Sequence, residues 1–205
     1  PVLPTGFANS ALPLHELDDG EFVQFCTDLL NLQPMIWCSR GRALVARRIF
    51  GAQRLLSGTN QHGGDIRADA EQGEVWMFQC KQVKQFHPSD TRKAIERAEH
   101  GWPHADQYVL LTTCGLSTKS QALVHGRTKW LWWDASRITS EVQKLEPRER
   151  GMNLVQRFGK EWVRRLFVWG DQPLLPWAEF FADDVSPERR HFHHRTNCQP
   201  RRETL

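Results

Sequence analysis

The sequence has no long run of apolar residues and no secretory leader in its first residues. No stretch approaches the roughly 18 to 20 consecutive apolar residues that a membrane-spanning helix needs. The opening segment, PVLPTGFANS, has neither the basic region nor the apolar region of a signal peptide. We therefore expect a soluble protein of the cytoplasm that makes no contact with a membrane.

Cysteine is sparse and unpatterned. The five cysteines are odd in number, scattered along the chain, and never form a C-x-x-C pair. This pattern excludes a disulfide framework and a zinc knuckle, and it predicts reduced thiols. The motif G-x-x-x-x-G-K-[ST] is also missing from the sequence. A nucleoside triphosphate site of the P-loop kind is therefore not expected.

Two further catalytic patterns are incomplete. His100 and His104 are separated by Gly-Trp-Pro, which breaks the helical spacing that an H-x-x-x-H metal motif needs. Cys114 and Ser117 lie in an expected loop without evident His and Asp partners, so a hydrolase triad is not indicated. The histidines near the end of the chain are of ligand type, but in an irregular tail solvated side chains are the simpler interpretation.

The balance of charge is mild overall but uneven along the chain. The net charge is +3, from 27 basic and 24 acidic residues, which does not by itself predict nucleic-acid binding. Between Arg189 and Arg202, however, five arginines and three histidines occur without any acid. This tail could bind phosphate or could simply be solvated. Lys84, Arg189 and Arg190 are the candidate contacts to nucleic-acid phosphates.

Hydrophobic periodicity predicts a first helix and a hairpin. An apolar stripe at helical spacing runs from Phe22 to Leu30, with Asp18 or Asp19 as a candidate N-cap. Residues 41–60 could form a strand, a short helix, or both. The segments DIRADA and EVWMFQCK have the pattern of two strands joined by a short turn, as in an antiparallel hairpin.

Helices and strands continue to alternate after the hairpin. The expected elements are a helix from Ser89 or Asp90 to Gly101, the strand QYVLLTT, a helix capped by Ser117, the strand KWLWWD and the helix SRITSEVQKL. This order predicts an α/β fold in three layers, in which helices flank a central sheet.

Pro147 and the charged segment EPRERG indicate a domain boundary. We expect a first domain of residues 1–147 and an extension of residues 148–205, within which FGKEWVRRLFVWG could form an amphipathic helix. The extension is too short for a core of its own. It is therefore expected to pack on the first domain or to link it to a further module.

The hairpin carries the strongest candidate for a site. Asp65 follows two glycines, which let the backbone turn sharply and approach another group closely. Gln79 and Lys81 are two residues apart, so they share one face of the second strand. If the hairpin pairs as its turn suggests, a carboxylate, an amide and an ammonium meet at one end of the sheet. Burying such a group alone costs about 2 kcal/mol or more, so the three groups satisfy one another, or a metal ion and a phosphate satisfy them.

Phosphodiester cleavage gives each of these groups a role. The reaction needs a hard cation held by oxygen ligands, for which Asp65, the Gln79 amide oxygen and the Cys80 carbonyl are candidates. The expected ion is Mg²⁺, with Mn²⁺ as a substitute. Lys81 could orient or deprotonate the attacking water and stabilise the transition state. Glu21 could hold a water or a second metal ion if the first helix packs over the sheet.

The same segments carry a resemblance to a known family. GGD followed by FQCK, with GEFVQFCTDLL before and VLLTTCGLSTKSQALV after, resembles the Mrr-like branch of the PD-(D/E)XK restriction-endonuclease superfamily. In that branch the middle acid of the signature is commonly glutamine, which gives D…QxK. The resemblance covers roughly residues 16–135. It implies a restriction-endonuclease-like fold with a mixed sheet and Mg²⁺-dependent hydrolysis of DNA. Asp65, Gln79 and Lys81 match the catalytic triad, and Glu21 matches the acid of the first helix.

The resemblance also implies a biological setting. Such domains serve as effectors fused to sensor or targeting modules, and PWAEFFADDVSPERRHFHH is similar to the linker before the NTPase module in some antiviral STAND proteins. The expected protein is an antiphage effector that a sensor or NTPase module activates by forming a homo-oligomer. No segment resembles a sequence-reading helix, so DNA binding is expected to depend on phosphates and to show weak sequence preference.

Other interpretations of the same residues remain open. The chain could be a catalytically inactive module of the same fold that binds nucleic acid or protein, or a nuclease directed at RNA. The residues could also be purely structural. Gly-Gly-Asp often forms a turn, a lysine at a strand end normally reaches water, and a strand glutamine normally pairs along an edge.

Overall fold

The computed structural model describes residues 6–7, 11–32, 35–40, 43–55, 63–159, 162 and 167–168. The helices are α1 (Asp19–Leu32), α2 (Pro88–Gly101), α3 (Thr118–His125), α4 (Ala135–Gln143) and α5 (Arg148–Phe158), with the short 3-10 helices η1 (Leu14–Glu16) and η2 (Glu71–Gly73). The strands are β1 (Gly6–Phe7), β2 (Met35–Arg40), β3 (Ala43–Arg54), β4 (Ile66–Ala70), β5 (Val75–Lys81), β6 (Gln107–Thr112), β7 (Trp130–Trp133) and β8 (Phe167–Val168).

Six of these strands form one mixed sheet. Its order is β2-β3-β4-β5-β6-β7. The pairs from β2 to β5 are antiparallel, whereas β6 pairs in parallel with both β5 and β7. The short strands β1 and β8 pair with each other in a separate antiparallel sheet. The α/β fold with a central mixed sheet, predicted from the sequence, is confirmed.

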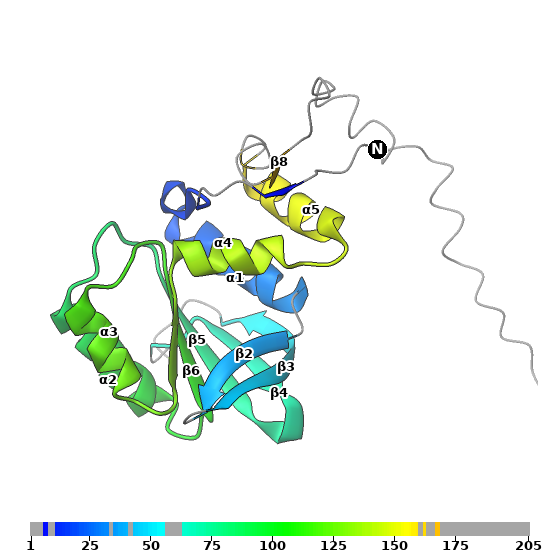
Figure 1. Ribbon diagram of the computed structural model, residues 1–205. Helices are drawn as coiled ribbons and strands as arrows, with labels where there is room; N and C mark the ends of the chain where they lie inside the picture. Colours follow the sequence, from blue (N-terminus) through cyan, green and yellow to red (C-terminus); the bar gives the residue numbers. More distant parts are fainter. Residues whose placement is uncertain are drawn as a thin grey trace, which may run out of the picture.

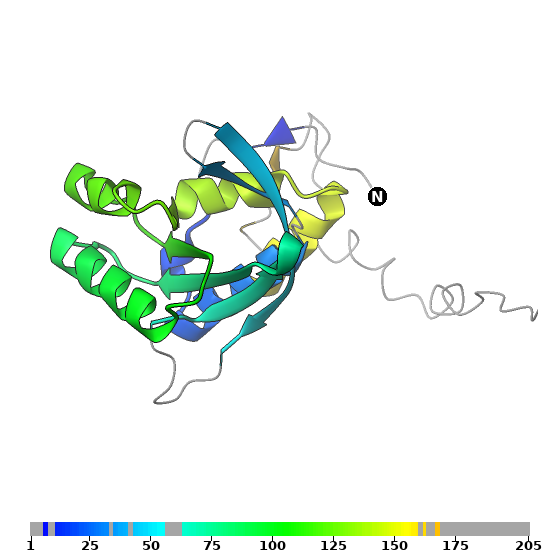
Figure 2. The same cartoon turned by 90° about the horizontal axis from the view of Figure 1, so that it is seen from below.

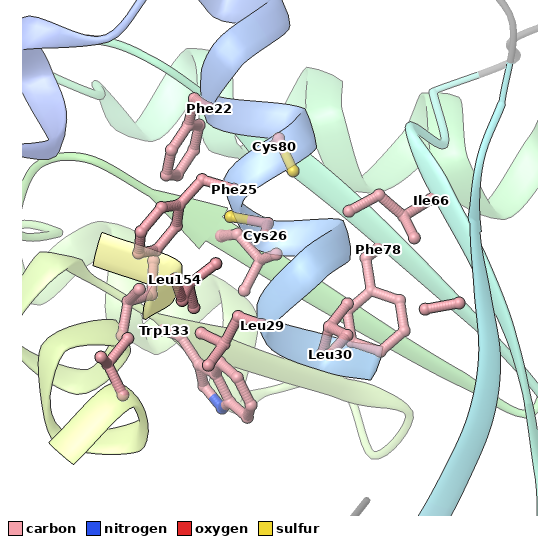
Figure 3. Packing of buried hydrophobic residues seen from close by; sticks show 14 of the residues in the cluster. Phe22, Phe25, Cys26, Leu29, Leu30, Ile66, Phe78, Cys80, Trp133 and Leu154 are labelled. Carbon is pink, nitrogen blue, oxygen red and sulfur yellow. The ribbon is translucent and has the colours of Figure 1, made fainter. Parts of the chain in front are cut away.

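Helices cover both faces of the sheet (Figures 1 and 2). Strand β5 shows how the two faces are divided, because its side chains alternate between them. Trp76, Phe78 and Cys80 lie in the core that α1, α4 and α5 share with the sheet (Figure 3). Met77 lies in the second core, which α2 and α3 share with the opposite face. The fold therefore has three layers.

Helix α1 begins with a reciprocal cap. The Glu21 N–H donates to Asp18 Oδ1 at 2.7 Å, and the Asp18 N–H donates to Glu21 Oε2 at 3.0 Å. Such a capping box satisfies two backbone donors that a helix start otherwise leaves unpaired. The predicted helix is confirmed, with Asp18 as its N-cap, and its apolar stripe from Phe22 to Leu30 is buried against the sheet.

The charged segment after Pro147 forms α5, which packs on α1. Phe158 meets Phe25 edge to face, with ring centroids 5.1 Å apart. Arg157 Nη1 lies 3.0 Å from Asp28 Oδ2. The first helix of the 148–205 extension thus shares the core of the preceding residues. Of the helix suggested within FGKEWVRRLFVWG, most residues lie outside the described ones, but Phe167–Val168 form strand β8, so the helix is wrong there.

The segment 41–60, for which the sequence left a strand, a short helix or both open, contains the long strand β3, so the strand alternative is confirmed. Strand β3 pairs with β2, which the sequence did not predict. Helix α2 begins at Pro88 with His87 as N-cap, so the expected caps at Ser89 or Asp90 are wrong. Proline suits a first helical position because it has no N–H to leave unpaired and its φ is already helical. Within the described residues, no helix has the length and apolar character to cross a membrane.

Candidate functional site

A cavity of about 400 Å³ opens where the start of α1 meets the ends of β3 and β5. Its charged lining residues are Asp19, Arg54, Asp65 and Lys81. They come from four different elements or the turns beside them, so only the folded sheet brings them together. The cavity has room for a phosphate group and several waters, because small-ligand sites begin at about 300 Å³.

Asp65 is fixed at the open end of the β4–β5 hairpin. The register pairs Ile66 with Phe78, so Asp65 stands one position further along, opposite Gln79. The Asp65 N–H donates to the Phe78 carbonyl at 2.8 Å, and its Oδ2 accepts the Cys80 N–H at 2.8 Å. Within the described part of the chain, Oδ1 accepts no hydrogen bond. The carboxylate is therefore oriented through one oxygen while the other remains available.

The surroundings of Asp65 disfavour its charge. Burial is the largest influence and raises the pKa of Asp65 above its ordinary value. The Lys81 ammonium and the Cys80 N–H lower the pKa, because both favour the ionised carboxylate. Smaller effects come from Asp19, which raises the pKa, and from Arg54, which lowers it. A cation placed beside Oδ1 would favour the ionised form further.

Gln79 is buried with an unsatisfied acceptor. The residue is 3% exposed, and within the part of the chain that the structure describes Oε1 has no hydrogen-bond partner. Leaving such an oxygen unpaired costs about 1–3 kcal/mol, so the site favours a donor or a cation there. Gln79 lines a second groove, of about 630 Å³, between the end of β5 and α2. Lys81 lines both this groove and the first cavity, and it therefore stands between Asp65 and Gln79.

The acid that α1 contributes to the cavity is Asp19. Glu21, the acid expected from this helix, is exposed, accepts the Asp18 N–H and does not line the cavity. Arg54 was also not anticipated, because the sequence left the structure of its segment open. The D-x-x-E spacing of a capping box is the sequence signal that could have indicated Asp19. It assigns the side chains of Asp18 and Glu21 to the helix cap, so Asp19 is the acid of this helix start that the cap does not use.

The remaining predicted residues lie apart from the charged cluster. The Cys80 thiol faces the core between β5 and α1, near Cys26 (Figure 3), and its pKa is raised well above its ordinary value, first by burial. Only the backbone of Cys80 can therefore serve the site. Lys84 is exposed and lines neither the cavity nor the groove. Arg189 and Arg190 lie outside the described residues.

The donor set is poor in carboxylates but fits a hard cation. Among the described residues, no group of three or more His, Cys, Asp or Glu side chains could hold a metal ion. Asp65 Oδ1 and Gln79 Oε1 are nevertheless oxygen acceptors without donors among the described residues, Asp65 lining the cavity and Gln79 lining the groove. Mg²⁺ suits such a site, because it binds through one or two carboxylates and keeps several waters. The Asp19 carboxylate and the Cys80 carbonyl belong to residues that line the cavity, and they are further oxygen ligands for a cation.

The Gly-Gly-Asp turn packs tightly against α2. Gly63 has a φ of +83°, and a Cβ at this position would lie 2.9 Å from the Ala98 backbone nitrogen and 2.8 Å from Arg97 Cγ. Glycine is required here both by the backbone conformation and by the close approach of the helix. The position of this turn determines where Asp65 enters the hairpin.

Replacing Gly63 with alanine is expected to lower the free energy of unfolding by about 2–6 kcal/mol, since backbone strain and overpacking each contribute about 1–3 kcal/mol. Two matched substitutions separate these causes in urea unfolding curves. Gly73 has a φ of +77° but open space where a Cβ would be added, so Gly73→Ala should be destabilised by backbone strain alone. Gly115→Ala has open space and no positive φ, so little change is expected. A Gly63→Ala loss no larger than that of Gly73→Ala would contradict the packing argument.

No family model matches the sequence, and a comparison with curated proteins finds no match. The chemistry of the site must therefore be judged from its own residues. Two carboxylates and two cations around one cavity can bind a divalent cation and a phosphate together. An oriented carboxylate beside a lysine that forms no ion pair with the described carboxylates is also suited to hydrolysis of a phosphate ester.

Proposed function

We propose that this chain is a Mg²⁺-dependent DNA endonuclease domain with a restriction-endonuclease-like fold of the Mrr-like branch. The observation that carries the proposal is Lys81, which lines one cavity with Asp65 and the next groove with Gln79; among the described residues, Asp65 Oδ1 and Gln79 Oε1 have no hydrogen-bond donor. Lys81 forms no ion pair with the described carboxylates, so its ammonium is available to substrate. The three residues are the D…QxK positions of the family signature, and they lie at the same end of two adjoining strands.

Asp65 and Gln79 would hold the cation through these two oxygens, with Asp19 and the Cys80 carbonyl as further donors. The cation, when bound, supplies positive charge that offsets the charge developing on the phosphate. The Cys80 N–H keeps Asp65 in one orientation, so the carboxylate needs little rearrangement to bind. Mn²⁺ is expected to replace Mg²⁺ because it accepts the same oxygen ligands.

Lys81 would act on the attacking water. Its position between the cavity and the groove lets the ammonium donate a hydrogen bond to that water, or the amine accept its proton. Arg54 lies across the cavity and would donate to a non-bridging phosphate oxygen. Both cations would also stabilise negative charge on the phosphate as the bond breaks.

The biological role follows from the resemblance. We infer an effector in antiphage defence that works in the cytoplasm and is switched on when a sensor or NTPase module of the same protein assembles it into a homo-oligomer. DNA binding would depend on phosphates and fall steeply with salt, with little preference for sequence.

Incubation of the purified chain with supercoiled plasmid in Mg²⁺, Mn²⁺ or EDTA tests the proposal. We expect nicked or linear products with either metal and none with EDTA. A matched RNA substrate tests the RNA-directed alternative, which predicts cleavage of RNA and not of DNA. Cleavage that persists in EDTA would exclude the proposed metal site.

A catalytically inactive module of the same fold is the second candidate. It is favoured by the small number of carboxylates, since the signature acid is Gln79 and Glu21 is engaged in the helix cap. Calorimetric titration with Mg²⁺ or Mn²⁺ separates the two candidates independently of cleavage. The nuclease should bind metal and lose that binding in Asp65→Ala, whereas an inactive module should show no difference between the two proteins.

A further inference from the structure

The groove between β5 and α2 has the features of a binding site in its own right. Its volume is about 630 Å³, and it is lined by Gln79, whose Oε1 is buried and has no partner among the described residues. Phe86 and Ala94 give it an apolar wall. A buried acceptor that lines an open groove indicates a ligand that approaches from the groove.

Helix α2 contributes two free cations to the same groove. Lys93 and Arg97 are exposed, line the groove, and form no ion pair with the described acids. They are four residues apart on one side of the helix, so their backbone positions are about 6 Å apart along its axis. Asp90 and Glu96 also line the groove, so its positive charges are separated by negative ones and do not form a continuous positive surface.

Lys81 connects the groove with the Asp65 cavity, because it lines both. A ligand that engages Asp65 and Gln79 together must therefore cross Lys81 and extend onto the α2 side. A nucleic-acid strand has the required form, with charges at regular intervals along a backbone and base edges that donate hydrogen bonds.

We propose that the groove between β5 and α2 binds the DNA strand on one side of the scissile phosphate, with Lys93 and Arg97 on backbone phosphates. The nucleotide beside the cleavage point then lies over Gln79 and against Phe86. This inference rests on the proposed nuclease function, and it specifies the path of the substrate across the protein.

The dependence of DNA affinity on salt tests this path without any cleavage. The affinity of the full chain for a short labelled DNA duplex is measured by fluorescence anisotropy in EDTA at several salt concentrations. Each phosphate contact contributes about one unit to the slope of log affinity against log salt. We therefore expect Lys93→Gln and Arg97→Gln each to reduce the magnitude of the slope by about one.

Arg92→Gln is the matched control. Arg92 is an exposed cation of the same helix that does not line the groove, so its substitution should leave the slope unchanged. Arg97 packs on Gly63, so Arg97→Gln could lower the stability of the fold. Lys93→Gln does not disturb this packing, and it keeps the test valid if Arg97→Gln is unstable.

The outcomes separate this inference from the proposed function. Salt-dependent DNA binding that is unaffected by both groove substitutions would overturn the path while leaving the nuclease in place. A chain that binds no DNA in EDTA or in Mg²⁺ would overturn both. If Lys93→Gln and Arg97→Gln change the slope only for a matched RNA duplex, the groove binds RNA, and the proposal that it binds a DNA strand is wrong.

Discussion

Replacing Lys81 with alanine is expected to reduce metal-dependent cleavage of plasmid by about 10²- to 10⁴-fold, the range that a positioned acid or base contributes. Lys81 lines both cavities and forms no ion pair with the described residues. Its removal breaks no ion pair or hydrogen bond among the described residues, and the pKa of Asp65 should rise further, so the carboxyl can take up a proton and the fold should survive. The rate of loss of supercoiled plasmid in Mg²⁺ gives the activity, and circular dichroism with thermal melting checks the fold.

Lys119→Ala provides the comparison, because it removes an exposed lysine of α3 that lines neither the cavity nor the groove. Its cleavage rate should equal that of the unsubstituted chain. Lys81→Arg keeps the charge but has no accessible neutral form, so a deep loss there would favour proton transfer over charge alone. Full activity in Lys81→Ala would show that Lys81 has no part in the mechanism and that cleavage takes place at another site.

The elements around the site were predictable because their patterns are local. Strand β5 alternates strictly between two faces, so its sequence alone put Gln79 and Lys81 on the same side. The short turn before it limits how far the hairpin can slip, and this turn fixed Asp65 near the strand end. Ser117 was recognised as an N-cap, and its side chain does accept the Ser120 N–H.

The other half of the cavity depends on contacts between distant segments. Strand β3 has two adjacent arginines in its middle, a third at its end and a register shift between Phe50 and Gln53, so it lacks the alternation that identifies a strand. Its pairing with β4 is what delivers Arg54 to the cavity. No local pattern in the sequence contains that information. The groove on the α2 side was missed for the same reason, since α2 reaches β5 only through tertiary packing.

Replacing Asp65 with asparagine is expected to abolish cleavage and to stabilise the fold at neutral pH. Cleavage is lost because a neutral amide is a much poorer ligand for a hard cation. Stability rises because burial raises the pKa of Asp65, which means that the folded environment disfavours the charged carboxylate, and a neutral amide avoids this cost. The amide oxygen can still accept the Cys80 N–H, so the turn keeps its hydrogen bond.

The sign of the pH dependence follows from the raised pKa. Between the ordinary pKa of the unfolded chain and the raised pKa of the folded chain, the folded state binds more protons, so stability falls as pH rises through that window. Asp65→Asn removes this fall. Its advantage over the unsubstituted chain should therefore grow as pH rises through that window and should vanish below the ordinary Asp pKa of about 3.9.

Thermal melting of both proteins at pH 7 and at acidic pH measures this effect, with an expected increase in Tm of about 2–4 °C at pH 7 for each kcal/mol gained. Saturating Mg²⁺ should raise the Tm of the unsubstituted chain, because a ligand of the folded state alone stabilises it by about 2.7 kcal/mol at 100 times its Kd. Asp65→Asn should not respond. A lower Tm for Asp65→Asn at pH 7 would show that Lys81 and the Cys80 N–H outweigh burial, and Asp65 would then be a structural carboxylate rather than one kept for a cation.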